Sequence, residues 1–313
     1  DNVCRAAMTR RRKPLAPALL KQRLDELVLT FDISTIEPDP LQLVLRCRDP
    51  RDQEVAGLIA AAFAYGRAET IVANIGAVLA KMRPGPYAYL RAFDPREAMR
   101  RFAGFAHRFH KTNDLVAFLG CIARVLESHG SLGALFEESY DANDADIAPA
   151  LARFTAVILS RADSEGSPGG TVRAQAQGVL RTAQDDRSLR YLLTSPLDGS
   201  ACKRMNLYLR WMVRRTPPDL GLWTFVDPAK LVMPLDTHVH RIATFLGLSD
   251  RRSGDWKTAR ALTDALARFD AADPVRYDFA LCRLGILDLC SRKQKKENCD
   301  VCLLRDVCRF PVA

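Results

Sequence analysis

Apolar residues recur at three- and four-residue spacing through most of this chain, and this spacing constrains the fold more than any other feature. It is clearest in the stretch DQEVAGLIAAAFAYGRAETIVANIGAVLAKM, residues 52–82, which is interrupted once at Tyr65-Gly66-Arg67. Such a period is typical of one face of an α-helix, and the Gly-containing interruption predicts two packed helices with a short connection. Strand-like alternation is almost absent. We therefore predict an all-α fold.

Composition limits the class of protein. The chain has 313 residues, 48% of them hydrophobic, so it can bury the core of one large domain or two ordinary ones. Its 46 basic and 37 acidic residues give a net charge of +9, which favours an anionic partner such as nucleic acid. We find no run of about 18 apolar residues, so no membrane span is expected. The odd number of cysteines, nine, and their uneven clustering favour a reducing compartment such as the cytoplasm.

Four cysteines lie close together near the C-terminus, in the stretch CSRKQKKENCDVCLLRDVC. Cys290, Cys299, Cys302 and Cys308 have the spacing C-x8-C-x2-C-x5-C. Four thiolates separated by short polar loops can converge on one metal, and both zinc and a [4Fe–4S] cluster accept four cysteine ligands. Unrelated thiols are the alternative, but this loop is too polar and basic to bury them for packing. The spacing predicts a metal site and leaves the choice between zinc and iron–sulfur open.

Two further stretches place reactive groups at expected helix starts. In LDGSACKRMNLYL, residues 197–209, a Gly-containing turn leads into a helix whose first turn holds Lys203. Backbone N–H groups at such a start can bind a phosphate. In VMPLDTHVHRI, residues 232–242, Asp236 is placed to cap a helix, and a carboxylate there can also serve in catalysis. His238 and His240 are two residues apart, so they point to different sides of a helix and are poor candidates for a shared metal.

Together these motifs resemble the helix-hairpin-helix DNA glycosylase superfamily, and within it the iron–sulfur enzymes similar to endonuclease III. The piece CDVCLLRDVC resembles the end of that family's cluster loop, and LDTHVHR, residues 235–241, resembles its segment with the essential acid. The first cysteine gap is two residues longer than in the family, and the connection from Lys203 to Asp236 is also longer. Asp198 and Ala201 replace the usual Pro and Gly of the hairpin. The hairpin matches at Leu197, Gly199, Lys203, Asn206 and Leu209.

The resemblance implies a base-excision repair enzyme of a bacterial branch. Lys203 would attack the sugar, with AP lyase activity as a result, and Asp236 would be the catalytic acid. The four cysteines would hold a [4Fe–4S] cluster, with zinc as the alternative. The partner would be double-stranded DNA carrying a damaged base, oxidised guanine being one candidate, or an abasic site. A non-catalytic iron–sulfur protein of the same fold that binds DNA or RNA is the alternative function.

The same resemblance assigns an architecture and contact residues. It implies a helical barrel lobe at residues 50–232 and a second lobe made of residues 1–49 and 233–313, with the cleft between them. We also expect a monomer associated with the nucleoid. The segments 113–178 and 214–230 receive no function, although a loop is predicted at 163–178. The expected DNA contacts are Tyr65, Arg67, Gly199, Ser200, Ala201, Arg204, Lys293, Lys295 and Lys296, and the expected base-pocket residues are Trp223 and His238.

Overall fold

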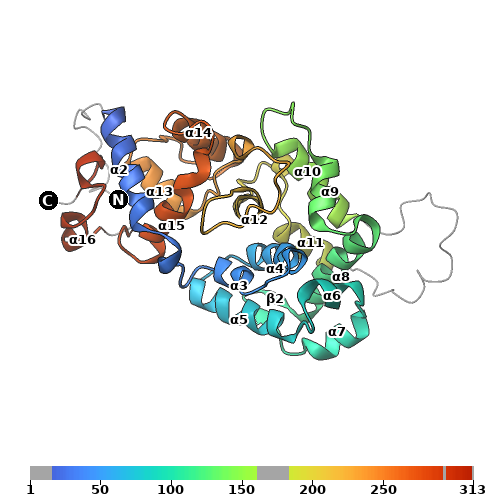
Figure 1. The fold of residues 1–313 in the computed structure, drawn as a ribbon. Coiled ribbons are helices and arrows are strands. Elements are labelled where there is room, and N and C mark those ends of the chain that lie inside the picture. Colours follow the sequence, from blue (N-terminus) through green and yellow to red (C-terminus); the bar gives the residue numbers. More distant parts are fainter. Residues whose placement is uncertain (1–15, 161–182, 292–293, 312–313) are drawn as a thin grey trace.

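The computed structural model describes residues 16–160, 183–291 and 294–311, and this part of the chain is mostly helical (Figure 1). The all-α prediction is therefore confirmed there, apart from one short β-hairpin. The predicted loop at 163–178 lies outside the described residues. The α-helices are α2 (Pro17–Thr30), α3 (Leu41–Leu45), α4 (Pro50–Ala62), α5 (Ala68–Lys81), α6 (Pro86–Arg91), α7 (Pro95–Arg101), α8 (Thr112–His129), α9 (Leu132–Ser139), α10 (Ala148–Leu159), α11 (Ala183–Leu192), α12 (Lys203–Val213), α13 (Thr237–Phe245), α14 (Trp256–Ala267), α15 (Asp278–Ile286) and α16 (Lys296–Asp300).

Shorter elements connect these helices. The strands β1 (Ala106–His107) and β2 (His110–Lys111) pair in antiparallel fashion, with His107 opposite His110. The 3-10 turns are η2 (Ile33–Thr35), η4 (Pro196–Asp198), η5 (Pro228–Lys230), η6 (Pro274–Tyr277) and η7 (Arg305–Val307).

The two helices predicted within residues 52–82 are α4 and α5. Asp49 caps α4 by accepting a hydrogen bond from the N–H of Arg51, and Pro50 occupies the first position of the helix. The chain turns at Gly66, whose φ of 101° suits a residue without a side chain. This confirms that the interruption at 65–67 is a helix junction.

Helix α12 lies in the middle of the molecule, beside α4 (Figure 1). Every residue after Lys203 in this helix is buried. Contact with α4 is close at Gly57, where an added Cβ would lie 2.9 Å from Met212 Cε and 3.2 Å from a ring carbon of Tyr208. A residue at the start of α12 is therefore held by the core and not by a surface loop alone.

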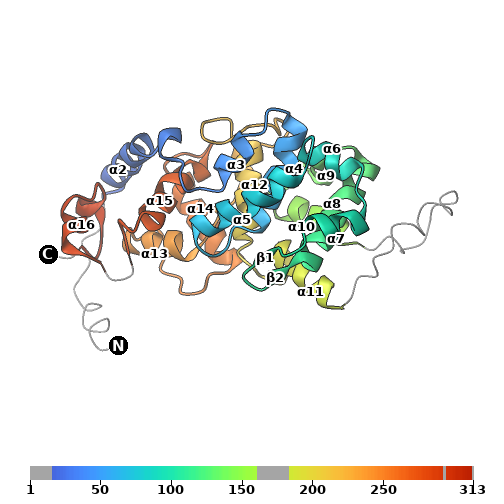
Figure 2. The same cartoon turned by 90° about the horizontal axis from the view of Figure 1, so that it is seen from below.

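The first described helix, α2, packs with the C-terminal third of the chain. Helix α2 contacts α15, η6 and η7, and α13 packs on α15, so these elements share one end of the molecule (Figure 2). Arg23 on α2 donates two hydrogen bonds to Asp306 Oδ2, at 2.9 and 2.7 Å. One continuous cluster of buried apolar residues includes members of both predicted lobes, and the division into lobes stays a prediction.

Within the described ranges, no single helix combines the length and apolar character needed to cross a membrane. Taken together, α8 and α9 meet that test, but they are bent by 72° at their junction.

Candidate active site and thiol cluster

Lys203 is the first residue of α12, and the turn before it sets this position. Gly199 and Cys202 both have positive φ angles, 70° and 48°, which reverse the chain before the helix begins. Lys203 is half-buried, and its Nζ donates a hydrogen bond to the carbonyl of Ala64 at 3.2 Å. The amine therefore lies beside the α4–α5 loop, at the end of the buried helix.

Asp236 is the N-cap of α13. Its Oδ1 accepts hydrogen bonds from the backbone N–H groups of His238 and Val239, at 2.8 and 2.7 Å. A cap of this kind stabilises a protein by about 1 kcal/mol. The predicted capping role is confirmed, and the cap does not use the second carboxylate oxygen, Oδ2.

Lys203 and Asp236 both act electrostatically on two groups of α15. Burial raises the pKa of the Asp278 carboxyl to about 6; Arg210 and Lys203 oppose this rise, whereas Asp236 adds to it. Burial also raises the pKa of the Cys282 thiol well above its usual range, again with Asp236 raising and Lys203 lowering it. The Cys282 thiol group is buried, although other atoms of the residue are exposed to solvent. Because such effects decline with distance, the amine and the carboxylate lie in one neighbourhood.

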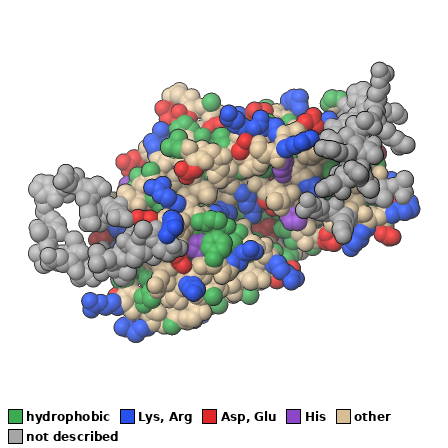
Figure 3. Space-filling view, turned by 180° about the vertical axis from the view of Figure 1, so that it is seen from behind, with side chains coloured by type: hydrophobic (Ala, Val, Ile, Leu, Met, Phe, Trp, Pro, Cys, Tyr) green, Lys and Arg blue, Asp and Glu red, His purple; other side chains and the backbone are tan. Residues whose placement is uncertain are grey.

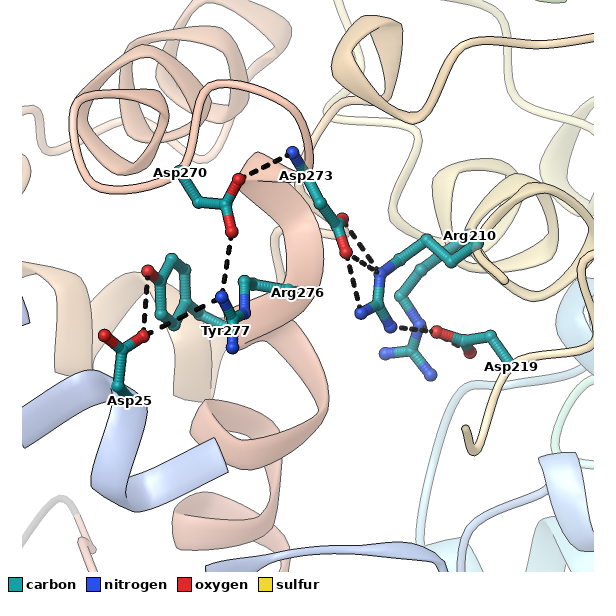
Figure 4. A network of polar contacts seen from close by, with 8 residues as sticks. Asp25, Arg210, Asp219, Asp270, Asp273, Arg276 and Tyr277 are labelled. Carbon is teal, nitrogen blue, oxygen red and sulfur yellow. Dashed lines mark hydrogen bonds and ion pairs between the residues drawn. The ribbon is translucent and has the colours of Figure 1, made fainter. Parts of the chain in front are cut away.

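A buried network of ion pairs lies behind Asp278. Arg210 on α12 donates to Asp278 and, at 3.1 Å, to Asp219. Arg214 donates to Asp219 as well, and to Asp273 at 2.9 Å. Figure 4 shows Arg210, Asp219 and Asp273 of this network. These arginines are buried, so the carboxylates offset the cost of removing two cations from water. The network holds Arg210 against Asp278.

The insertion 214–230 contributes to the core as well as to this network. It supplies Asp219 and also Trp223, which is only 1% exposed. The indole Nε1 donates to Glu54 Oε1 at 2.8 Å, and the ring stacks on Phe136 with centroids 5.0 Å apart. The expectation that Trp223 lines a base pocket is therefore corrected: its indole fills the core, where the only polar atom already has a partner.

His238 is in the first turn of α13, and its side chain faces α15. It packs directly over Gly285, where an added Cβ would lie 2.4 Å from His238 Cβ. Arg241 donates to His238 Nδ1 at 3.3 Å and also to the carbonyl of Cys290. The residue is half-buried, and these contacts make it a packing residue of the helix pair that carries Asp236.

The predicted DNA contacts of the hairpin differ in accessibility. Gly199 is exposed, Ser200 is half-buried and Ala201 is buried. The carbonyl of Gly199 accepts a hydrogen bond from the N–H of Trp256 at 3.2 Å, and Ser200 forms a β-bridge with Asp255. This turn is therefore fastened to the start of α14.

Arg204 is not a surface residue, contrary to its predicted role as a phosphate contact. Its guanidinium donates to the carbonyls of Ala62, at 3.2 Å, and of Tyr191. It also lies over the ring of Tyr191, 4.3 Å from the centroid. Burial lowers its pKa. The side chain therefore fastens α12 to α4 and α11.

In the α4–α5 loop, Tyr65 and Arg67 point to different surroundings. The Tyr65 hydroxyl lies 2.5 Å from His110 Nδ1, and burial raises the pKa of this phenol. The Arg67 side chain is 86% exposed, with Glu69 as an ion-pair partner at 3.9 Å. Because the carbonyl of Ala64 accepts from Lys203, exposed Arg67 is within one short loop of the amine.

The four C-terminal cysteines line one cavity. All four are free and partly exposed. Burial raises the pKa of Cys290 to about 11, and the other three thiols contribute to the rise. Four thiols around one cavity are a donor set that suits zinc or a [4Fe–4S] cluster. In the described ranges, however, no three metal-binding side chains are already close enough to hold a single ion.

Residues 290–308, which carry the four cysteines, are called the thiol loop. Lys295 and Lys296 in this loop are exposed and have acidic neighbours. Lys295 pairs with Asp288 at 3.5 Å, and Lys296 pairs with Asp300 at 3.3 Å. Surface pairs of this kind contribute little to stability, so these side chains can exchange partners. Lys293, the third predicted contact in this loop, lies outside the described residues.

Asp278, Cys282 and Arg210 lie in the same neighbourhood as Lys203 and Asp236 but were not predicted from the sequence. Asp278 begins α15, and a carboxylate at the edge of an otherwise amphipathic stretch was the one available signal. Cys282 is not part of the cysteine cluster, and Arg210 is one arginine among many. Their roles depend on contacts between segments far apart in the chain.

Comparison with known proteins gives one match. Residues 39–287 match the family described as "Protein of unknown function (DUF2400)". The matched range includes Lys203, Asp236 and the whole of α15, and it ends before Cys290. No curated protein and no solved structure matches the chain. Because the matched range covers most of its length, the protein belongs to the DUF2400 family.

Proposed function

We propose that this protein is a base-excision repair DNA glycosylase that cleaves the N-glycosidic bond of a damaged base and has AP lyase activity through Lys203. The proposal rests on the positions of Lys203, at the start of α12, and Asp236, at the N-cap of α13. Both lie close enough to Asp278 and Cys282 to influence the pKa values of those groups. Two residues from separate sequence motifs, each at a helix start, thus combine an amine and a carboxylate in one neighbourhood.

The chemistry requires both groups. A neutral Lys203 amine can attack C1′ of the sugar, and the N-glycosidic bond breaks as the base leaves with the bonding electrons. Positive charge develops on the sugar in such a reaction, and a fixed carboxylate at Asp236 would stabilise it. The same carboxylate can accept the proton that the amine must lose. The hydrogen bond to Ala64 would orient the amine before substrate binds.

The proposed substrate is double-stranded DNA with a damaged base or an abasic site. The net charge of +9 and the exposed Arg67 beside the Lys203 loop support an anionic partner. Lys295 and Lys296 provide further exposed positive charge, close to the four cysteines. Oxidised guanine is the first damaged base to test.

We further propose that Cys290, Cys299, Cys302 and Cys308 hold a [4Fe–4S] cluster, with zinc as the alternative. Their common cavity and their chemistry support this assignment. When bound, such a cluster would crosslink the loop and provide a one-electron redox centre. Arg241 would connect that loop to α13, because it donates to the carbonyl of Cys290.

The test is borohydride trapping on duplexes that carry an abasic site, 8-oxoguanine, uracil or an oxidised pyrimidine. We expect a covalent adduct with the wild-type protein and none with Lys203→Gln, because only a primary amine forms a reducible Schiff base. The matched control is Lys230→Gln. Lys230 is also half-buried and also donates to a single backbone carbonyl, that of Asp144 at 2.6 Å, and its loss should leave trapping unchanged.

An adduct that persists in Lys203→Gln would refute the assignment of the nucleophile. Wild-type protein that binds these duplexes but gives neither an adduct nor a released base would refute the enzymatic proposal. That result would favour the non-catalytic nucleic-acid-binding function.

A further inference from the structure

Two aromatic side chains near Lys203 are exposed although each touches other aromatic rings. Phe109 is 57% exposed at the turn between β1 and β2, and Tyr191 is 40% exposed in the last turn of α11. The hairpin and α11 lie side by side (Figure 2). A large exposed apolar surface with a defined shape often marks an interaction site. Phe109 and Tyr191 are called the aromatic platform below.

The rings of the platform are held from beneath. Phe109 stacks on Tyr65, with centroids 5.7 Å apart and planes inclined by 23°, and it meets Tyr191 edge to face at 4.8 Å. Tyr65 is fixed by the contact of its hydroxyl with His110. The buried guanidinium of Arg204 supports Tyr191 from one side. The platform is therefore preorganised, and binding to it would require little ordering of side chains.

Positive charge surrounds the platform. Arg108 and Lys111 flank Phe109 in the sequence, and both are exposed. Arg187 is also exposed and precedes Tyr191 by four residues, which places both on the same face of α11. On the face opposite to that of Figure 1, apolar side chains gather with Lys and Arg side chains at their border (Figure 3). Exposed aromatic rings bordered by cations are the combination that binds unpaired bases and their phosphates.

The platform is connected to the candidate active site through one loop. The Arg108 side chain lies against Gly66, where an added Cβ would be 3.3 Å from Arg108 Cδ. Gly66 is in the same loop as Ala64, whose carbonyl accepts the hydrogen bond from Lys203. The platform and the amine therefore border the same α4–α5 loop.

We infer that the aromatic platform stacks an unpaired base of a DNA strand beside the Lys203 site. An intact duplex hides the faces of its bases, whereas an extruded base, or a base left without its partner, exposes them. The platform thus adds selectivity for DNA that is locally unpaired, through ring stacking and without reading base edges. The inference rests on the proposed function for its choice of DNA, but stacking does not depend on the chemistry at Lys203.

The test is the affinity of the full chain for a fluorescently labelled single-stranded oligothymidine, measured by anisotropy at one fixed salt concentration. We expect Phe109→Ala and Tyr191→Ala each to weaken binding about tenfold, in line with the usual effect of losing one aromatic stacking partner. Phe109→Trp should retain affinity, because it keeps a ring at the position. Leu29→Ala is the control for loss of an exposed apolar side chain, because Leu29 is 81% exposed on α2, and it should bind as wild type does.

The outcomes separate this inference from the proposed function. Wild-type affinity in both alanine variants, or wild-type protein that does not bind the oligothymidine, would overturn the platform whatever trapping shows. Loss of affinity in both alanine variants with rescue by Phe109→Trp would support it, even if no adduct forms at Lys203. Circular dichroism of each variant checks the fold. If Phe109→Ala is misfolded, Phe109→Leu replaces it. This variant keeps an apolar side chain without a ring, so it should show the same loss of affinity.

Discussion

Asp278 shows how the fold changes the acid–base behaviour of one side chain. Burial raises its pKa to about 6, above the ordinary 3.8, although Arg210 donates a hydrogen bond to it. Because the folded-state value is the higher one, the folded protein binds this proton more tightly than the unfolded chain does. The stability contributed by the group is therefore complete below pH 3.8 and is lost as the pH rises through about 6.

Asp278→Asn removes this titration while keeping the shape of the side chain. From about pH 4 to about pH 7, we expect the wild type to lose unfolding free energy relative to the variant, by up to about 3 kcal/mol. Urea unfolding of both proteins across this range measures the change. A difference between them that stays constant with pH would contradict the assignment of the raised pKa to Asp278.

Single residues also show what the sequence predicted and what it could not. Lys203 and Asp236 were found because a helix start and an N-cap depend on nearby residues, and both positions are confirmed. Arg204 and Trp223 were misplaced, because their surroundings are set by segments distant in the chain. The sequence presents Arg204 as a neighbour of Lys203, whereas the fold turns its guanidinium inward to the carbonyl of Ala62.

At the scale of elements, α13 and α15 depend on one glycine for their close approach. In Gly285→Ala, the new methyl group would lie 2.4–2.5 Å from three atoms of His238, including its Cβ, which cannot swing away as a chain end can. Alanine favours a helix by about 1 kcal/mol over glycine, so any loss of stability must come from this clash. We expect the unfolding free energy, measured with urea, to fall by about 1–3 kcal/mol. Borohydride trapping should also weaken, because Asp236 caps α13 and would move with it.

Gly254→Ala is the matched control for this change. A Cβ there meets no atom within 4 Å, so stability and trapping should both stay near wild type. Equal stability of the Gly285 and Gly254 variants would show that α13 and α15 are not packed as described.

The helices themselves were predictable further than their packing. The pair α4 and α5 follows from apolar spacing and a glycine, both visible within residues 52–82. The aromatic contacts of the β1–β2 hairpin, by contrast, unite Tyr65, Phe109 and Tyr191 from three separated segments. No local pattern indicates that these rings meet.

At the scale of the whole molecule, the thiol loop joins the two ends of the described chain. Asp306 holds Arg23 of α2, and Cys290 accepts from Arg241 of α13. A metal centre in the loop would fix both contacts at once. We therefore expect purified protein to contain iron and acid-labile sulfide in equal amounts, and Cys302→Ser to lose both and to melt at a lower temperature.

Cys47→Ser is the control for this measurement, since Cys47 is a partly exposed thiol outside the loop and its loss should leave the iron content unchanged. Protein that contains zinc and no iron would replace the cluster by the alternative metal. Full metal content in Cys302→Ser would remove this thiol from the ligand set.

The burial of α12 has a consequence for how such a chain can change over generations. Lys203 is the first residue of α12, and all the other residues of this helix are buried. Substitutions that shift α12 therefore also disrupt folding. Natural selection for a folded chain alone would then keep the backbone of the amine in place, even in descendants that had lost its chemistry. The identity of the side chain at 203, and not the geometry around it, is what would record whether a descendant is still an enzyme.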